Sequence, residues 1–228
     1  MSTAHSARAR ARIEVTAAIK DEARRQLAAE GAAKLSLRAV ARELGMVSSA
    51  LYRYFPSRDD LLTALIIDAY DSVGEAAETA LGAVGDADPV ERWTVVCEAV
   101  RTWALAHPHE YALIYGTPIP GYVAPETTVP AAARVALVLI GIVRDARMGP
   151  GLDLPPLPAD LESEAERMAA DFASDLPPAV APALVAAWAQ LFGLIGFELF
   201  GQFHRVVEER EAFFRNAARH LAHGVGLS

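Results

Sequence analysis

Apolar residues recur every three or four positions along most of the chain, which is the spacing of one face of an α-helix. In residues 11–30 this stripe includes Ile19, Ala23 and Leu27, and Gly31 follows where a left-handed residue commonly closes a helix. The two-residue alternation typical of half-buried strands is almost absent. We therefore expect an all-α protein.

Capping residues and proline-rich breaks set the expected boundaries of the helices. Ser57 is followed three residues later by Asp60, a capping-box spacing, and the segments GTPIPGYVAP, MGPGLDLPPLP and DLPPAVAP are poor helix interiors. The predicted helices cover about residues 11–30, 36–44, 48–55, 57–81, 89–106, 108–115, 127–147, 159–174, 180–203 and 206–222.

Charge divides the chain into two parts. Residues 1–60 hold 11 Lys or Arg against 7 Asp or Glu, whereas the remainder holds 10 against 22. A basic segment on an acidic body is typical of a nucleic-acid-binding head, so we expect one domain at 1–60 and a second at 61–228.

The first ten residues, MSTAHSARAR, look like a flexible basic arm, and arms of this kind reach DNA in some proteins and stay solvated in others. No apolar segment follows these arginines, so we expect no secretory leader and a cytoplasmic protein.

The stretch from Leu44 to Leu62 reads as the second half of a helix-turn-helix, with Gly45 as the turn. Val47, Leu51 and Phe55 are four residues apart and can form one buried face of the second helix. Polar and aromatic side chains are left for its other faces, where the second helix of such a motif meets base edges in the major groove.

Each remaining side chain has a chemistry suited to DNA. Arg53 can donate two hydrogen bonds to a guanine edge or hold a phosphate, and the tyrosine hydroxyls can contact phosphates. Helix N-termini near Ser36 and Arg58 offer further phosphate sites. The candidate DNA-binding residues are Ser36, Arg38, Val47, Ser48, Ser49, Tyr52, Arg53, Tyr54 and Arg58.

The segment SLRAVARELGMVSSALYRYFPSRDDLLTAL resembles the DNA-binding head of the TetR family of transcriptional regulators. The positions that carry the resemblance are Ala41, Gly45, Leu51, Tyr52, Tyr54, Phe55, Arg58 and Leu61. The chain departs from the family pattern at Val47, where Ser or Thr is frequent, and the resemblance then leaves Ser48 as the capping residue. It also has Arg58 where Lys is usual.

The resemblance implies a homodimeric repressor that binds double-stranded DNA at a palindromic operator and releases it on binding a small apolar effector. The segments TWALAHPHEYALIYGTPIPGY and AWAQLFGLIGFELFGQF resemble, more weakly, a C-terminal domain of actinobacterial family members. In the second segment Phe192-Gly193 stands where that domain often has His-Gly.

Aromatic residues at helical spacing are usually core, but ligand pockets are also apolar and aromatic. The candidate ligand-binding residues are Trp103, Tyr111, Tyr115, Trp188 and Phe192. His107 and His109 flank a proline and have no third ligand nearby, so we expect no metal site, and no motif calls for a cofactor.

Residues 179–197 carry no formal charge, but Pro182, Gln190 and the glycines argue against a membrane span. A dimer interface formed by the last two helices fits better, with Gly193 and Gly196 permitting close approach. Glu198 could bind a cationic ligand or, preferably, pair with an arginine such as Arg205 of a second subunit.

Two other classes of function remain open. The body could act as an enzyme or small-molecule carrier while the head does not act on DNA, or the head could bind nucleic acid without sequence preference. No paired carboxylates, Ser-His-Asp or Cys-His arrangement or phosphate loop favours catalysis. The single cysteine, Cys97, excludes a disulfide within the chain.

Overall fold

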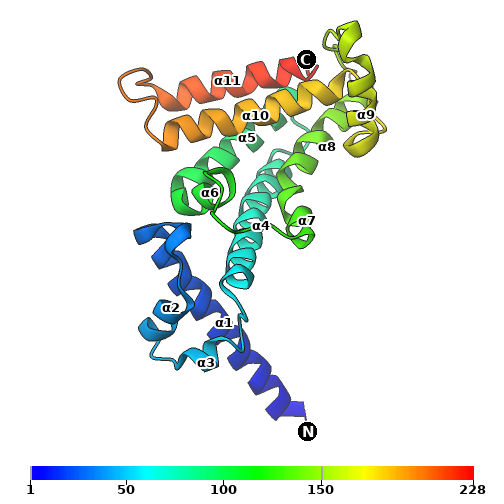
Figure 1. The fold of residues 1–228 in the computed structure, drawn as a ribbon. Helices are drawn as coiled ribbons and strands as arrows, with labels where there is room; N and C mark the ends of the chain where they lie inside the picture. Colours follow the sequence, from blue (N-terminus) through cyan, green and yellow to red (C-terminus); the bar gives the residue numbers. More distant parts are fainter. Residues whose placement is uncertain (1, 150) are drawn as a thin grey trace. The chain divides into compact units, whose positions relative to one another are not determined.

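The computed structural model describes residues 2–149 and 151–228, with side chains from residue 7 onward. These residues form helices and no strands, which confirms the all-α prediction (Figure 1). The helices are α1 (Ser2–Glu30), η1 (Ala32–Lys34), α2 (Leu37–Glu43), α3 (Ser48–Leu51), α4 (Arg58–Val84), α5 (Pro89–Ala106), α6 (Pro108–Tyr115), η2 (Glu126–Thr128), α7 (Val129–Ala132), α8 (Arg134–Met148), η3 (Ala159–Leu161), α9 (Glu162–Phe172), α10 (Val180–Leu199) and α11 (Arg210–Gly224).

Internal contacts divide the chain into two compact units. The head unit comprises Met1–Tyr70 with His109–Val129, and the body unit comprises Asp71–Pro108 with Pro130–Ser228. The chain therefore crosses between the units three times. The first crossing lies inside α4, which continues from one unit into the other as a single helix.

The head unit has its own apolar core, built from α1, α2, α3 and the first turns of α4 (Figure 1). Leu51 and Phe55 are buried there, as the four-residue spacing predicts. The other buried members of this core are Ile19, Ala23, Leu27, Leu35, Leu37, Val40, Ala41, Leu61, Leu62 and Leu65.

Serine side chains cap α2 and α4, and the cap at Ser57 was predicted from its spacing to Asp60. The Ser36 hydroxyl accepts a hydrogen bond from the Ala39 amide at 3.4 Å and closes the start of α2. At the start of α4, Ser57 Oγ accepts from the Asp60 amide at 3.1 Å and donates to the Asp60 carboxylate at 2.7 Å. Each cap satisfies an amide that the helix leaves unpaired.

Two expectations about the head unit are wrong. The segment expected as a flexible arm is helical from Ser2, because alternating Ala and Arg are strong helix formers and extend the helix that begins further along the chain. Val47 does not join the buried face of the recognition helix, because it lies before the first helical turn as an extended N-cap residue and is 70% exposed.

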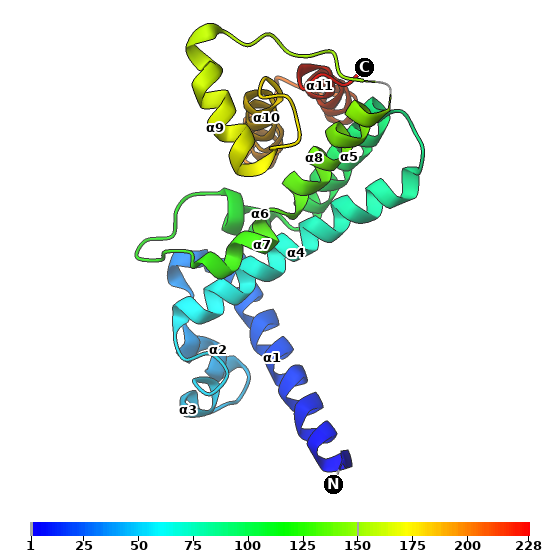
Figure 2. The same cartoon turned by 90° about the vertical axis from the view of Figure 1, so that its right-hand side faces the viewer.

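In the body unit α5 packs against α8, α10 and α11, and α10 also contacts α9 (Figure 2). Trp93, Leu191 and Ile195 are almost fully buried. The helix α10 has the length and apolar composition of a membrane span, but buried residues recur along its whole length and pack against these neighbouring helices. That is typical of the core helix of a helical body.

A single arginine fastens the start of α8 to α4. Arg134 donates to both carboxylate oxygens of Glu78 at 2.9 and 2.7 Å, and to the main-chain and side-chain oxygens of Asp71 at 2.8 and 2.9 Å. The hydrogen bonds to Glu78 are the main reason that the pKa of Arg134 is raised. The side chain lies across Gly74, where a Cβ would be 2.7 Å from Arg134 Cβ.

We predict that Gly74→Ala lowers the free energy of unfolding by about 1–2 kcal/mol, because the added methyl displaces Arg134 at its rigid Cβ rather than at its flexible end. Gly82→Ala is the matched control on the same helix, where a Cβ meets nothing within 4 Å. It should stabilise the protein by about 0.5–1 kcal/mol. Urea unfolding measures both, and equal effects would contradict the close packing at Gly74.

Candidate DNA-binding surface and ligand cavity

The turn of the helix-turn-helix brings α3 into position beside α2. Gly45 adopts a φ of +64°, which side-chain-bearing residues rarely adopt, and the Met46 amide donates to the Ala41 carbonyl at 2.8 Å. The one buried side chain of α3 is Leu51. Its burial fixes the rotation of this short helix and leaves the other faces accessible.

Most of the candidate DNA-binding residues lie on the surface of the head unit. Arg38, Val47, Ser49, Tyr52 and Arg53 are exposed. The partly exposed candidates are Ser36, Ser48, Tyr54 and Arg58. Tyr54 also packs under Arg12 of α1, whose guanidinium carbon lies 5.2 Å from the ring centre. The surface formed by α3 and the turn after it therefore presents short hydroxyls, a phenol and an exposed arginine together.

Arg58 has a different role from the one expected. Its guanidinium donates to the carbonyls of Ala32 at 2.8 Å, Leu35 at 3.2 Å and Ala33 at 3.3 Å. It thereby ties the start of α4 to the η1 turn that leads into α2. This arrangement holds the helix-turn-helix in place, and it uses the Nε and Nη2 donors of Arg58 within the head unit.

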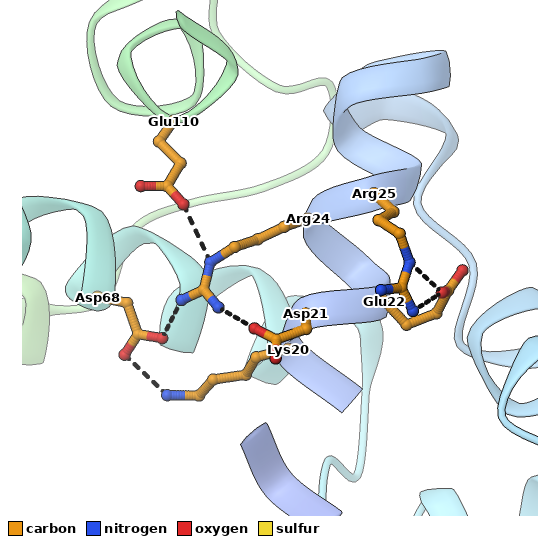
Figure 3. A network of polar contacts seen from close by, with 7 residues as sticks. All are labelled: Lys20, Asp21, Glu22, Arg24, Arg25, Asp68 and Glu110. Carbon is orange, nitrogen blue, oxygen red and sulfur yellow. Dashed lines mark hydrogen bonds and ion pairs between the residues drawn. The ribbon is translucent and has the colours of Figure 1, made fainter. Parts of the chain in front are cut away.

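A polar network joins three helices of the head unit (Figure 3). The Arg24 guanidinium on α1 donates to Asp21 at 2.9 Å and to Asp68 of α4 at 2.7 Å, and it lies 3.0 Å from Glu110 of α6. Lys20 donates to the other oxygen of Asp68 at 2.7 Å. Since the side chains that join the three helices are mostly buried, this network holds α6 more firmly than an isolated surface pair would.

The segment after α6 completes its attachment to the head unit. Leu113, Ile119 and Tyr122 pack against the head core, and the Tyr122 hydroxyl lies 2.9 Å from Thr63 Oγ1. The sequence indicated only that this proline-rich segment interrupts the helices. Its partners lie more than forty positions away along the chain, so no local pattern indicated them.

The five candidate ligand-binding residues are divided between the two units. Tyr111 and Tyr115 belong to the head unit, with ring centres 5.3 Å apart, and burial raises the pKa of Tyr115. Trp103 belongs to the body unit, where its Nε1 donates to Ser72 Oγ at 2.9 Å and its ring stacks on His107. None of these three side chains is among the residues that line the cavity described next.

That cavity lies within the body unit and has a volume of about 230 Å³. Trp188 of α10 is one of its walls, and Phe192 packs against Trp188 with ring centres 4.5 Å apart. The other lining residues are Trp93, Ala133, Ala136, Leu137, Leu139, Ile140, Phe172, Leu184 and Val185. Of the five candidates Trp188 lines this cavity, whereas Trp93 and the α8 wall were not among the candidates. Apolar helix positions look alike in sequence whether they border a cavity or a packed core.

Glu198 finds its partner inside the same chain. Its two oxygens accept from Arg101 Nε and Nη2 of α5, both at 2.7 Å, and only 6% of its side chain is exposed. The ion pair expected with Arg205 of a second subunit is therefore not needed to satisfy this buried acid. Arg101 also lies over the Phe214 ring, so α5, α10 and α11 meet at this pair.

The two interface glycines differ in their surroundings. Gly193 is exposed and a Cβ there would meet nothing within 4 Å, whereas Gly196 is buried among the helices of its own chain. Gly193 belongs to an apolar groove between α10 and α11, which we call the α10–α11 groove. Its lining residues are Gln190, Gly193, Leu194, Phe197, Phe203, Ala217, His220 and Leu221.

Cys97 and His107 have surroundings that suit structural roles. Cys97 is fully buried, and desolvation raises the pKa of its thiol, which lowers its reactivity. His107 Nδ1 lies 2.9 Å from the Trp103 carbonyl at the end of α5. Among the described residues, no group of three or more His, Cys, Asp or Glu side chains converges as a metal site would require.

The glycine turn, the exposed α3 and the capped α4 define a helix-turn-helix DNA-binding protein. The family profile described as bacterial regulatory proteins of the tetR family matches residues 19–65, and the one described as a tetracyclin repressor-like C-terminal domain matches residues 93–221. The chain belongs to the TetR family of bacterial transcriptional regulators.

Relatives and solved structures agree with this assignment. The chain is 39% identical over 204 residues to the HTH-type transcriptional regulators Rv1816 of Mycobacterium tuberculosis and Mb1846 of Mycobacterium bovis, covering 85% of this chain and 84% of each relative. The crystal structure of regulatory protein SCO4313 superposes with a TM-score of 0.77 at 34% identity, covering 93% of this chain and 97% of that one. The TetR-family regulator PfmR of Thermus thermophilus shares the fold, with a TM-score of 0.60, 20% identity and coverage of 90% and 97%.

We predict that Arg101→Met lowers the free energy of unfolding by about 3–5 kcal/mol, because it leaves Glu198 buried without a partner. Adding Glu198→Leu to that variant should recover most of the loss, since two apolar side chains then replace the ion pair. Urea unfolding of the two single variants and the double variant gives the coupling energy. Additive losses would show that the two side chains do not act as a pair.

Proposed function

We propose that this regulator is a homodimeric repressor that acts in the cytoplasm, binds a palindromic operator, and releases it when a small apolar effector enters the body unit. The observation that carries the proposal is the accessible surface of α3. The helix buries one leucine and leaves two serines for other contacts, and the turn after it adds Tyr52 and Arg53. This surface is suited to a partner with both bases and phosphates.

Residues on this surface have separable roles. Arg53 is exposed and makes no hydrogen bond or ion pair with the residues that the structure describes, so it is the residue we assign to a guanine edge. Ser48 and Ser49 let the helix approach the groove closely, and Tyr52 donates to a phosphate. Ser36 and Arg38, at the start of α2, contact the DNA backbone. Arg58 holds the helix-turn-helix in position through its hydrogen bonds to main-chain carbonyls.

The proposed dimer rests on the α10–α11 groove. Phe197 is 54% exposed and Phe213 is 40% exposed, so this face carries large apolar side chains that a second copy would cover. A pair related by two-fold symmetry presents two recognition helices, which is the reason for proposing a palindromic operator.

Effector release follows from linkage between two sites. A ligand that binds better to the conformation unfit for DNA lowers DNA affinity, and DNA lowers the ligand affinity by the same factor. The cavity beside Trp188 is the effector site that we propose, because its walls are apolar and it lies in the body unit.

The competing class of function is an enzyme or carrier whose head does not act on DNA. A protein of that class would bind DNA from its own upstream region no better than unrelated DNA at any salt concentration. A binder without sequence preference would show a steep salt dependence and equal affinity for both DNAs.

We predict that Arg53→Ala weakens binding to the specific site by about 1–3 kcal/mol and relaxes the preference at one base position. Fluorescence anisotropy across a salt series provides the measurement. If Arg53 holds only a phosphate, affinity should fall for all sequences and the salt slope should become shallower. Arg167→Ala, which removes the same charge from α9, is the control, and Arg53 is not at the interface if both variants bind alike.

We predict that Gly193→Trp separates or distorts the dimer, because the exposed, open position would receive a large ring in the centre of the α10–α11 groove. Gly82→Trp places the same ring on the exposed face of α4, where nothing lies within 4 Å, and should leave the dimer intact. Analytical ultracentrifugation distinguishes the two. A Gly193→Trp dimer as tight as the parent would place the interface elsewhere.

A further inference from the structure

The cavity beside Trp188 is unusual in the uniformity of its walls. All ten lining residues are apolar or aromatic, and they come from α5, the start of α8, α9 and α10. No acid, base, amide or hydroxyl side chain lines it. A ligand inside would therefore find surfaces for dispersion and hydrophobic contact, but no charged partner for an ionised group.

Its volume limits the ligand as well. An apolar cavity of about 150 Å³ accommodates benzene. At about 230 Å³, this cavity has space for one ring with a short chain, or roughly ten carbon atoms. A longer molecule would have to extend through the opening.

The opening is bordered by apolar side chains that are partly exposed to solvent. Leu137 is 57% exposed, Val185 44% and Phe172 37%. Each comes from a different helix, and together they surround the space next to Trp188. A ligand that covers them removes apolar surface from water, which favours binding.

This opening is separate from the face proposed for the dimer. On α10 the cavity uses Leu184, Val185 and Trp188, whereas the α10–α11 groove uses Gly193 and Phe197. At 3.6 residues per turn the two sets lie on roughly opposite sides of the helix. A second copy in the groove therefore leaves the cavity open to a small molecule.

We propose that the ligand of this cavity is an uncharged hydrocarbon-like molecule of about ten carbons, such as a short-chain alkylbenzene, and that the cavity rejects the corresponding carboxylate. This rests on the proposed function, in which the body unit binds an effector, and it names the chemical class of that effector. An ionised carboxylate in these walls would lose its hydration and gain no cation, and the unpartnered indole N–H of Trp93 could replace only a small part of its hydration shell.

The test compares n-butylbenzene with 4-phenylbutanoate, which has the same ten carbons but a carboxylate in place of the terminal methyl group. Isothermal titration calorimetry on the full-length protein, without DNA, measures both affinities. We expect n-butylbenzene to bind at least about 100-fold more tightly than the carboxylate. Equal affinities, a preference for the carboxylate, or no saturable binding of n-butylbenzene would each overturn the proposal.

Variants locate the binding to this cavity. Ala136→Leu fills the α8 wall and should weaken n-butylbenzene binding at least about tenfold. Ala170→Leu makes the same change at an exposed position of α9 outside the cavity and should leave the affinity unchanged. If Ala136→Leu fails to fold by circular dichroism, Val185→Phe narrows the exposed opening instead, and an affinity unchanged by the filling variant that folds overturns the assignment.

A charge introduced at the opening tests the reason for the selectivity. Leu137→Arg places a cation beside the cavity at a half-exposed position, where the guanidinium can stay hydrated. It should raise the affinity for 4-phenylbutanoate at least about tenfold. If the affinity does not change, the missing cation is not the cause of the selectivity, and that result contradicts the proposal.

These outcomes are independent of the regulatory function. The proposed function fails if the chain shows no preference for a DNA sequence, whatever binds the cavity. The ligand class fails if the calorimetric selectivity is absent, even where the chain binds a specific operator.

Discussion

The continuity of α4 is the constraint on which the rest of the structure depends. Its main chain is hydrogen-bonded as one helix from Arg58 to Val84, with its start in the head unit and its end in the body unit. The capping box at Ser57 fixes where the helix starts, and Arg58 ties that start to the turn before α2. The head end of α4 therefore supports the turn that leads into α2.

Each unit attaches a further helix to α4 by an arginine. In the head unit Arg24 joins α1 and α6 to Asp68 of α4, and in the body unit Arg134 joins α8 to Asp71 and Glu78. The three acids lie within roughly three turns of one another on a single helix.

Arg134 lies within two positions of Ala133 and Ala136 in the sequence, and both alanines line the cavity. A ligand that shifts the α8 wall would act directly on a residue bound to α4, which gives the proposed linkage a short physical route.

Local features of the fold were predictable from the sequence because local forces determine them. The glycine turn at Gly45 and the caps at Ser36 and Ser57 depend on residues within a few positions of one another. The four-residue spacing of Leu51 and Phe55 indicated that they share one face. The extended position of Val47 was not predictable from spacing alone, because the helix begins one residue later than the apolar repeat indicates.

Long-range features could not be read from the sequence. Glu198 and Arg101 are 97 positions apart, and nothing near either residue indicates the other. The cavity was the hardest feature to predict, because Trp93 and Trp188 line it while Trp103, equally aromatic and helical, hydrogen-bonds to Ser72 instead. Such differences arise only when the helices pack.

The central claim is that α3 reads a DNA sequence as one of a symmetric pair. Selection of bound fragments from a random DNA pool, followed by sequencing, tests it most directly. The account predicts enrichment of an inverted repeat whose half-site centres lie about one helical turn apart, or a multiple of it, roughly 34–36 Å per turn. Recovery of fragments without a common sequence, or of a single half-site with no symmetric partner, would contradict it.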